Sequence, residues 1–136
     1  MCLVKKCASL LFASFLGILV SSLIEPVPAS AQTLEWTFVR QHHRTIHFKL
    51  YSRNRDFVWP DRSNHWVLND FSPHTVRVNC YAGETICYGA WDAFKENVHW
   101  GAGRGGQRGC PNCCITCNQS GGKGSTTLLD VPDHID

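Results

Sequence analysis

The stretch HTVRVNCYAGETICYGAW, residues 74–91, contains two apolar runs on either side of a turn signal. From 74 to 80 apolar and polar residues alternate, and a period of two is typical of a β-strand with one buried face. Residues 81–84 form a predicted turn, because Gly83 adopts a positive φ without steric cost. Residues 85–91 form a second strand, so the two runs together predict a β-hairpin.

Further strands are predicted on both sides of this hairpin. They cover residues 36–39, 45–51, 66–68 and 97–100, and a long loop at 52–64 has room for a short edge strand before Pro60. After the N-terminal segment, no stretch shows a helical repeat longer than about three turns. Short strands separated by turn signals predict an all-β fold, namely a small single-domain β-sandwich or barrel of about six to seven short strands.

The N-terminal segment has the three parts of a signal peptide. Lys5 and Lys6 precede an apolar run at 8–23, and Ala29-Ser30-Ala31 supplies small residues for cleavage. The apolar run is shorter than the roughly 20 residues that span a bilayer. We therefore expect residues 1–31 to be a cleaved signal peptide, with a retained membrane anchor as the alternative. The mature chain is then secreted or periplasmic and has no transmembrane segment.

Six cysteines remain after the predicted cleavage, because Cys2 and Cys7 lie within the signal peptide. An even number of cysteines in an exported chain predicts disulfides. The six are Cys80, Cys87, Cys110, Cys113, Cys114 and Cys117. Cys113 and Cys114 are adjacent and are not expected to pair with each other, since their Cα atoms lie about 3.8 Å apart, closer than disulfides prefer. We expect the C-terminal cysteine cluster to be fastened to the predicted hairpin.

The chain after residue 100 lacks a regular pattern. Residues 101–109 are rich in glycine, and the cysteine cluster follows them. From Ser120 onward the composition is dominated by Gly, Ser, Thr and Asp, which predicts a mobile end. We therefore expect a β domain at 32–118, with an irregular Gly/Cys-rich C-terminal segment, and a flexible tail at 119–136.

A metal-binding protein is the alternative interpretation of the cysteine cluster. Cys110, Cys113, Cys114 and Cys117 form two overlapping C-x-x-C pairs, a spacing that lets two thiolates face one ion. Export and the even cysteine count favour disulfides instead, so no metal and no cofactor are expected.

Three histidines lie close together in the sequence. His43 and His47 would lie on one face of a strand, but about 13 Å apart, too far to share an ion. A sharp bend between 40 and 44 would weaken that objection. We expect His42, His43 and His47 to be surface histidines.

Several other sequence features fail to support a specific chemistry. Residues 101–106 match G-x-G-x-x-G, but no helix is predicted after them to hold a pyrophosphate. The formal net charge is only +2, which argues against nucleic acid as a partner. Neither G-x-S-x-G nor H-E-x-x-H occurs. Catalytic activity is therefore not predicted, although a small secreted hydrolase with a His and carboxylate cleft remains an alternative.

Aromatic residues suggest a binding surface. Trp59 lies in a charged loop and Tyr81 at a turn, so these two are the hardest of the large aromatics to bury by pattern. With Phe57 and Arg62 they form the predicted contact set, while a loop that folds back over the sheet is the alternative for Trp59. The sequence therefore predicts an exported, disulfide-stabilised binding or envelope-associated protein, whose partner is a protein, a glycan or an envelope surface.

Overall fold

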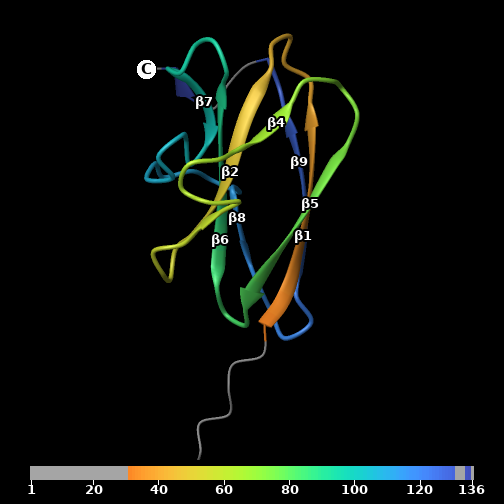
Figure 1. Cartoon of the computed structure of the whole chain (residues 1–136), viewed down its shortest axis with the longest axis vertical. Coiled ribbons are helices and arrows are strands. Elements are labelled where there is room, and N and C mark those ends of the chain that lie inside the picture. The colour runs from red at the N-terminus through yellow and green to blue at the C-terminus, as the bar shows by residue number, and fades with distance from the viewer. Residues whose placement is uncertain (1–30, 131–133, 136) are drawn as a thin grey trace, which may run out of the picture.

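Two β-sheets packed face to face form the part of the chain that the structure describes, residues 31–130 and 134–135 (Figure 1). The structure is a computed structural model, and every regular element in the described residues is a strand. The described part contains no helix long and apolar enough to cross a membrane. The predicted all-β, sandwich-like fold is confirmed. Apart from Ala31, the predicted signal peptide lies outside the described residues.

The smaller sheet has β1 at its centre. In spatial order its strands are β5 (His74–Tyr81), β1 (Ala31–Arg40) and β9 (Gly122–Leu128). β1 pairs antiparallel with β5 and parallel with β9, so both of its edges are hydrogen-bonded. Alternate side chains of β1, such as Trp36 and Phe38, are buried against the other sheet, as its alternating pattern predicts.

The larger sheet is built around β2 and β6. Its strands are β10 (His134–Ile135), β7 (Val98–Gly101), β6 (Thr85–Asp92), β2 (Ile46–Ser52) and β3 (Val58–Trp59) in spatial order, with β4 (Trp66–Leu68) paired to β2 and β8 (Cys114–Thr116) paired to β6. Because β6 has β2 on one side and β7 and β8 in succession on the other, its residues from 86 to 92 are all buried.

An aromatic cluster fills the space between the sheets. Phe38 of β1 lies 4.4 Å from Phe48 of β2 and 5.6 Å from Tyr88 of β6, measured between ring centroids. Trp36 meets the same Tyr88 ring nearly edge-on. Aromatic pairs of this kind add about 0.5–1.5 kcal/mol beyond the burial of their area. These aromatic rings join the two sheets in the core, and the alternating patterns of β1 and β2 predicted that their rings point inward.

The predicted hairpin at 74–91 is wrong, although both of its strands exist. β5 pairs with β1 and β6 pairs with β2, so the turn at 82–84 carries the chain from one sheet to the other. Gly83 has the expected positive φ of 86°. Alternation shows which face of a strand is buried but carries no information on the neighbouring strand. Two adjacent strands of a sandwich can therefore resemble a hairpin in sequence.

The predicted flexible tail at 119–136 is also corrected, because Gly122–Leu128 forms β9. Its register with β1 runs from Gly122 opposite Leu34 to Leu128 opposite Arg40. Backbone hydrogen bonds hold this strand, and its small residues let it approach the core closely. A Cβ atom at Gly122 would lie 2.7 Å from a Leu34 methyl group. Composition alone suggested mobility because β9 has few of the branched or aromatic residues that usually mark a strand.

The six cysteines outside the predicted signal peptide form three disulfides, Cys80–Cys117, Cys87–Cys114 and Cys110–Cys113. The first two fasten the C-terminal cluster to β5 and β6, as expected, and the third closes a short loop within the cluster. Cys113 and Cys114 are not bonded to each other, also as expected. Disulfides persist in oxidising compartments, so the bonded cysteines indicate an oxidising environment.

Candidate functional site

A groove runs along the outer edge of β5, between the two sheets. One hollow of about 580 Å³ lies against residues 77–81 of β5, and a second of about 390 Å³ lies against residues 74–77. Trp66 and Arg77 line both hollows, so the two are adjacent along the strand. We call this feature the β5 groove. It follows β5 from end to end.

Three of the four predicted contact residues meet at one end of the β5 groove. Phe57, Trp59 and Tyr81 all line its larger hollow. The Phe57 and Tyr81 side chains are 43% and 41% exposed, whereas Trp59 is only 7% exposed because β3 pairs with β2 and turns this ring inward. The alternative in which the loop folds back over the sheet is therefore correct for Trp59. Phe57 and Tyr81 remain accessible to a ligand.

Arg55 organises this end of the groove. Its guanidinium carbon lies 4.4 Å from the Phe57 ring centroid and 4.7 Å from that of Tyr81. Arg55 Nε donates a hydrogen bond to Glu84 Oε1 over 2.6 Å. Cation–π contacts of this kind contribute about 0.5–1 kcal/mol at exposed sites. Arg55 was not predicted, because three arginines lie within ten residues of the loop and nothing in the pattern distinguishes them.

Glu84 anchors Arg55 from inside the protein. The Glu84 side chain is buried, and it accepts further hydrogen bonds from Ser52 Oγ at 2.7 Å and from the Tyr81 backbone N–H at 2.9 Å. Burial acts to raise the pKa of Glu84, but the hydrogen bonds from Arg55, Tyr81 and Ser52 outweigh it and hold this pKa below its ordinary value. Glu84 is therefore an ionised carboxylate at neutral pH.

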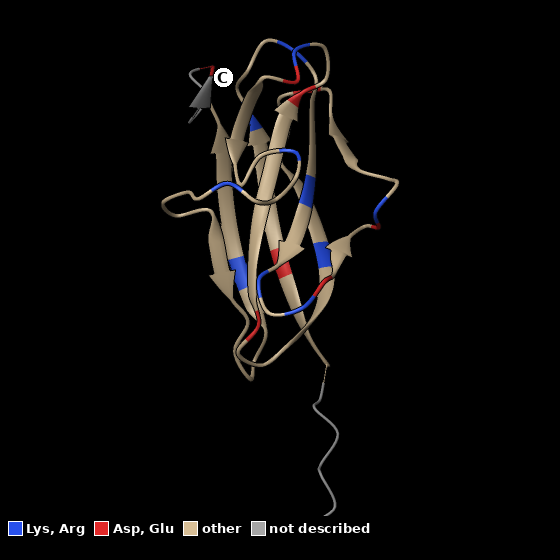
Figure 2. Ribbon diagram, turned by 90° about the vertical axis from the view of Figure 1, so that its left-hand side faces the viewer, with Lys and Arg blue, Asp and Glu red and all other residues tan. Residues whose placement is uncertain are grey.

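The charge of the groove is one-sided. Arg55 and Arg77 line it, and no Asp or Glu is among the described residues that line either hollow. Over the rest of the molecule basic and acidic residues are interspersed (Figure 2). The β5 groove therefore has cations and aromatic rings in its lining, while the partner carboxylates Glu84 and Glu35 lie outside that lining.

The structure places Arg62, the fourth predicted contact residue, in a different hollow of about 450 Å³, with Lys49, His65, Trp91 and Arg104. Arg62 forms an ion pair with Asp56 at 2.5 Å, and both side chains are exposed. Nearby, the His47 ring stacks on His65 with centroids 4.0 Å apart. Burial, then the charges of His65 and Arg104, lower the pKa of His47. Arg62 thus does not belong to the β5 groove.

The cysteine cluster offers no thiolate in this structure. Cys110, Cys113, Cys114 and Cys117 are all bonded in disulfides. A zinc or cluster site requires deprotonated thiols, which a disulfide does not supply. The alternative metal site at the cluster therefore requires reduction of these bonds.

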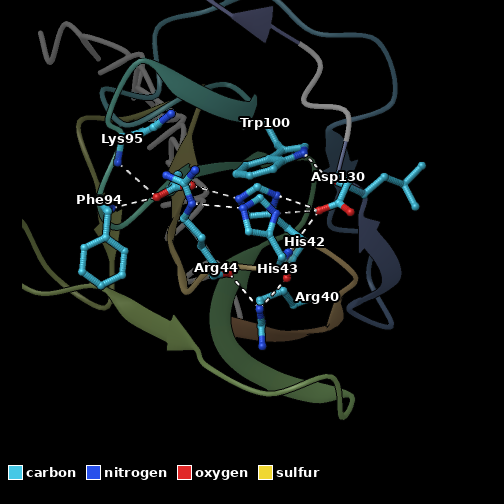
Figure 3. A network of polar contacts seen from close by, with 10 residues as sticks. Arg40, His42, His43, Arg44, Phe94, Lys95, Trp100 and Asp130 are labelled. Atoms are coloured by element: carbon cyan, nitrogen blue, oxygen red, sulfur yellow. Dashed lines mark hydrogen bonds and ion pairs between the residues drawn. The ribbon is translucent and has the colours of Figure 1, made fainter.

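A buried polar network at the opposite end of the sandwich was not predicted (Figure 3). His42 is 4% exposed, so the expectation of a surface histidine is wrong at this position. Its Nε2 lies 2.9 Å from Asp92 Oδ2 and its Nδ1 lies 3.1 Å from Asp130 Oδ1. His43 Nδ1 lies 3.2 Å from the same Asp130 oxygen. Fifty and eighty-eight residues separate His42 from the two carboxylates, and no local pattern connects such distant positions.

Backbone groups and arginines hold this network in place. The Asp92 carboxylate accepts hydrogen bonds from the backbone N–H of Phe94 at 2.8 Å and of Lys95 at 3.0 Å. Burial acts to raise the pKa of Asp92, but the hydrogen bonds from His42 and these two N–H groups outweigh it and lower the pKa. Arg40 donates to the carbonyl oxygens of both His42 and Arg44 and so fixes the bend between β1 and β2.

The hydrolase alternative gains no support from the network. None of the residues labelled in Figure 3 carries a hydroxyl or thiol that could act as a nucleophile beside His42, and neither does Asp92, which contacts its Nε2. Among the residues that the structure describes, none that lines the β5 groove supplies a carboxylate for an acid–base pair. The chain matches no family model, no curated protein and no solved structure.

Proposed function

We propose that this chain is an exported, disulfide-stabilised binding protein that takes an extended segment of a partner protein in the β5 groove. The observation that carries the proposal is the groove's position along a sheet edge. Among the described strands, β5 pairs with β1 alone, so its other side offers backbone N–H and C=O groups to an added strand. Eight residues of β5 give a docking edge of about 27 Å.

Side chains of the groove suit this mode of binding. Phe57 and Tyr81 expose ring surface at one end, and the partly buried Trp66 lines both hollows. Aromatic residues and arginine are enriched where protein interfaces have their strongest contacts. A strand added to β5 would direct alternate side chains toward these rings, which gives the groove a means of selecting sequence.

A polypeptide fits the groove better than a glycan does. Sugars bind proteins mainly by stacking on open aromatic faces, and Arg55 already lies over the Phe57 and Tyr81 rings. The backbone edge of β5, by contrast, is complementary to another backbone. The edge and the partly covered ring faces both favour a protein partner over the glycan or envelope surface that the sequence also allowed.

The charge of the groove favours an acidic segment. Arg55 and Arg77 are the charged residues that line the larger hollow, and their carboxylate partners, Glu84 and Glu35, are not among its lining residues. Acidic side chains on a bound strand would meet these guanidinium groups at nitrogens other than those that donate to Glu84 and Glu35. We therefore take the ligand to be an extended, acidic polypeptide that also carries apolar side chains.

The compartment follows from two observations together. The N-terminal residues have the pattern of a signal peptide, and the three disulfides are typical of an oxidising compartment. We propose that the protein acts after export, in the periplasm or outside the cell, on a partner in the same space.

Peptide display against the disulfide-bonded chain starting at Gln32 tests this function. We expect selected peptides to be rich in Asp or Glu and in β-forming apolar residues. Their affinity is then measured for Arg77→Glu on β5 and for Lys123→Glu on β9, which reverse the same charge on opposite edges of one sheet. Arg77→Glu should weaken binding about tenfold or more, and Lys123→Glu should leave it unchanged. Failure to select any peptide, or equal effects of the two variants, would contradict the proposal.

A further inference from the structure

We propose that His42, His43 and Asp130 bind one divalent transition-metal ion, with Zn²⁺ as the best fit. One ligand atom from each of the three side chains lies within 4.8 Å of the others. The Nδ1 atoms of His42 and His43 lie 3.1 and 3.2 Å from Asp130 Oδ1. Two ligands about 2.05 Å from a tetrahedral ion are separated by about 3.3 Å, so each histidine nitrogen already lies at the spacing of a coordination shell from the Asp130 oxygen.

Asp92 gives His42 the orientation that a metal ligand needs. His42 Nε2 lies 2.9 Å from Asp92 Oδ2, and both side chains are buried. Metal-binding histidines commonly donate their second ring N–H to a carboxylate, which fixes the tautomer and the plane of the ring. With its hydrogen on Nε2, the His42 ring presents the Nδ1 lone pair toward Asp130 and His43.

Both ring nitrogens of His42 face a carboxylate oxygen, Nε2 that of Asp92 and Nδ1 that of Asp130. A neutral imidazole has one N–H, and in the tautomer assigned above it lies on Nε2 and is donated to Asp92. The Nδ1 lone pair of His42 would then face a carboxylate oxygen of Asp130 at 3.1 Å, an acceptor against an acceptor. Either a second proton on the ring or a metal ion between the two atoms resolves this repulsion. A metal ion, unlike a proton on His42, also uses the nearby Nδ1 of His43 as a third ligand.

The scaffold brings the three ligands together without relying on flexible side chains. His42 and His43 lie in the bend between β1 and β2, and Asp130 follows β9. The Gln41 backbone N–H donates to Leu128 O at 2.8 Å and so extends the pairing of β1 with β9 up to the site. The Trp100 ring meets the His42 ring with centroids 5.0 Å apart, and Trp100 Nε1 donates to Leu129 O at 3.1 Å.

The site is open on its outer side. The His43 and Asp130 side chains are each 63% exposed, whereas His42 is buried. An ion bound by three protein ligands therefore has room for a water molecule at the fourth position. One contact must change on binding, because Arg44 Nε donates to His43 Nε2 at 3.1 Å. With an ion at Nδ1, the neutral His43 ring carries its hydrogen on Nε2, and the partly exposed Arg44 side chain moves off it.

Calorimetric titration of the disulfide-bonded chain with Zn²⁺ tests the proposal. We expect one Zn²⁺ per chain and a loss of affinity of about tenfold or more in His43→Ala and in Asp130→Asn. Both altered side chains are exposed, so these variants should fold. His74→Ala is the matched control, because His74 is an exposed histidine whose Nε2 lies 2.7 Å from Asp70. It should bind Zn²⁺ as the wild type does.

Nitrogen NMR of the histidine rings provides the second readout. We expect Zn²⁺ to shift the Nδ1 signals of His42 and His43 and to leave the signals of His47 and His65 unchanged. No Zn²⁺ binding by the wild type, unchanged affinity in both site variants, or shifts at His47 and His65 instead would overturn the proposal. The Asp130 site and the β5 groove share no residue, so either result leaves the peptide-binding proposal to its own test.

Discussion

Arg55 Nε donates to Glu84 Oε1 over 2.6 Å, and this bond joins the loop after β2 to the turn between β5 and β6. The same Arg55 guanidinium lies over the Phe57 and Tyr81 rings. The exposed end of the β5 groove is therefore shaped by a carboxylate buried beneath it. Any change at Glu84 should alter both the stability of the sandwich and the geometry of the groove.

Glu84→Gln should destabilise the protein at neutral pH by about 2 kcal/mol, because three donors lose a charged acceptor. The folded-state pKa of Glu84 lies below its ordinary value of 4.5. Its contribution is therefore present above that value and is lost as the pH falls through the folded-state pKa. Urea unfolding at pH 7 and at pH 3 measures the difference, which should shrink at pH 3. Glu96→Gln, at an exposed carboxylate, should behave as the wild type at both pH values.

Trp59→Ala and Phe57→Ala should separate stability from binding. Trp59 is buried, so its truncation should cost about 3–5 kcal/mol in the free energy of unfolding. Phe57 is partly exposed and should cost less than about 1 kcal/mol while weakening peptide binding. Denaturant unfolding and calorimetry on both variants check this. A stable Trp59→Ala protein would show that β3 does not cover the core.

Removal of individual disulfides should have unequal effects. Cys80–Cys117 closes a sequence separation of 37 residues and Cys110–Cys113 a separation of 3. Chain entropy then assigns about 4 kcal/mol to the first and about 2 kcal/mol to the second. The two double alanine variants can be compared by thermal unfolding. Equal losses would mean that native contacts of the bridges, and not loop closure, dominate their contribution.

Gly121→Ala should show whether β9 is a packed strand. Gly121 has a φ of 94°, and a Cβ atom there would collide with the Thr33 carbonyl of β1. We expect a loss of more than about 1 kcal/mol in unfolding free energy. Gly105→Ala is the control, because no atom lies within 4 Å of its added Cβ. If both variants were equally stable, residues 121–128 would behave as the tail that their composition suggested.

The sequence predicted most of the strands but not their pairing. Alternation located β2 and β5 and identified their buried faces, and the export pattern indicated that the cysteines outside it are bonded. The partners of β5 and β6 could not be predicted, since a turn between sheets and a hairpin turn use the same residues. β9 was not predicted, because its backbone pairing with β1 requires no apolar pattern.

Of the candidate site residues, too, some were predicted from the sequence and others were missed because their contacts are distant in the chain. Phe57 and Tyr81 were found because a charged loop and a turn leave aromatic rings without an evident core. Arg55 and Glu84 were missed because their roles depend on contacts 29 residues apart in the chain. The contact of His42 with Asp130 depends on the docking of β9 beside β1, which the composition of residues 119–136 concealed. Its contact with Asp92 depends on the pairing of β2 with β6, which the sequence did not predict either.

Hydrogen exchange on the β5 backbone tests the central claim most directly. The uniformly labelled, disulfide-bonded chain is compared with and without a saturating acidic peptide from the display selection. Strand addition predicts that amides at alternate positions within 74–81 become protected, while those of β9 at the opposite edge keep their rates. Unchanged exchange in β5, with protection appearing around Lys49, Arg62 and Arg104 instead, would contradict binding in the β5 groove.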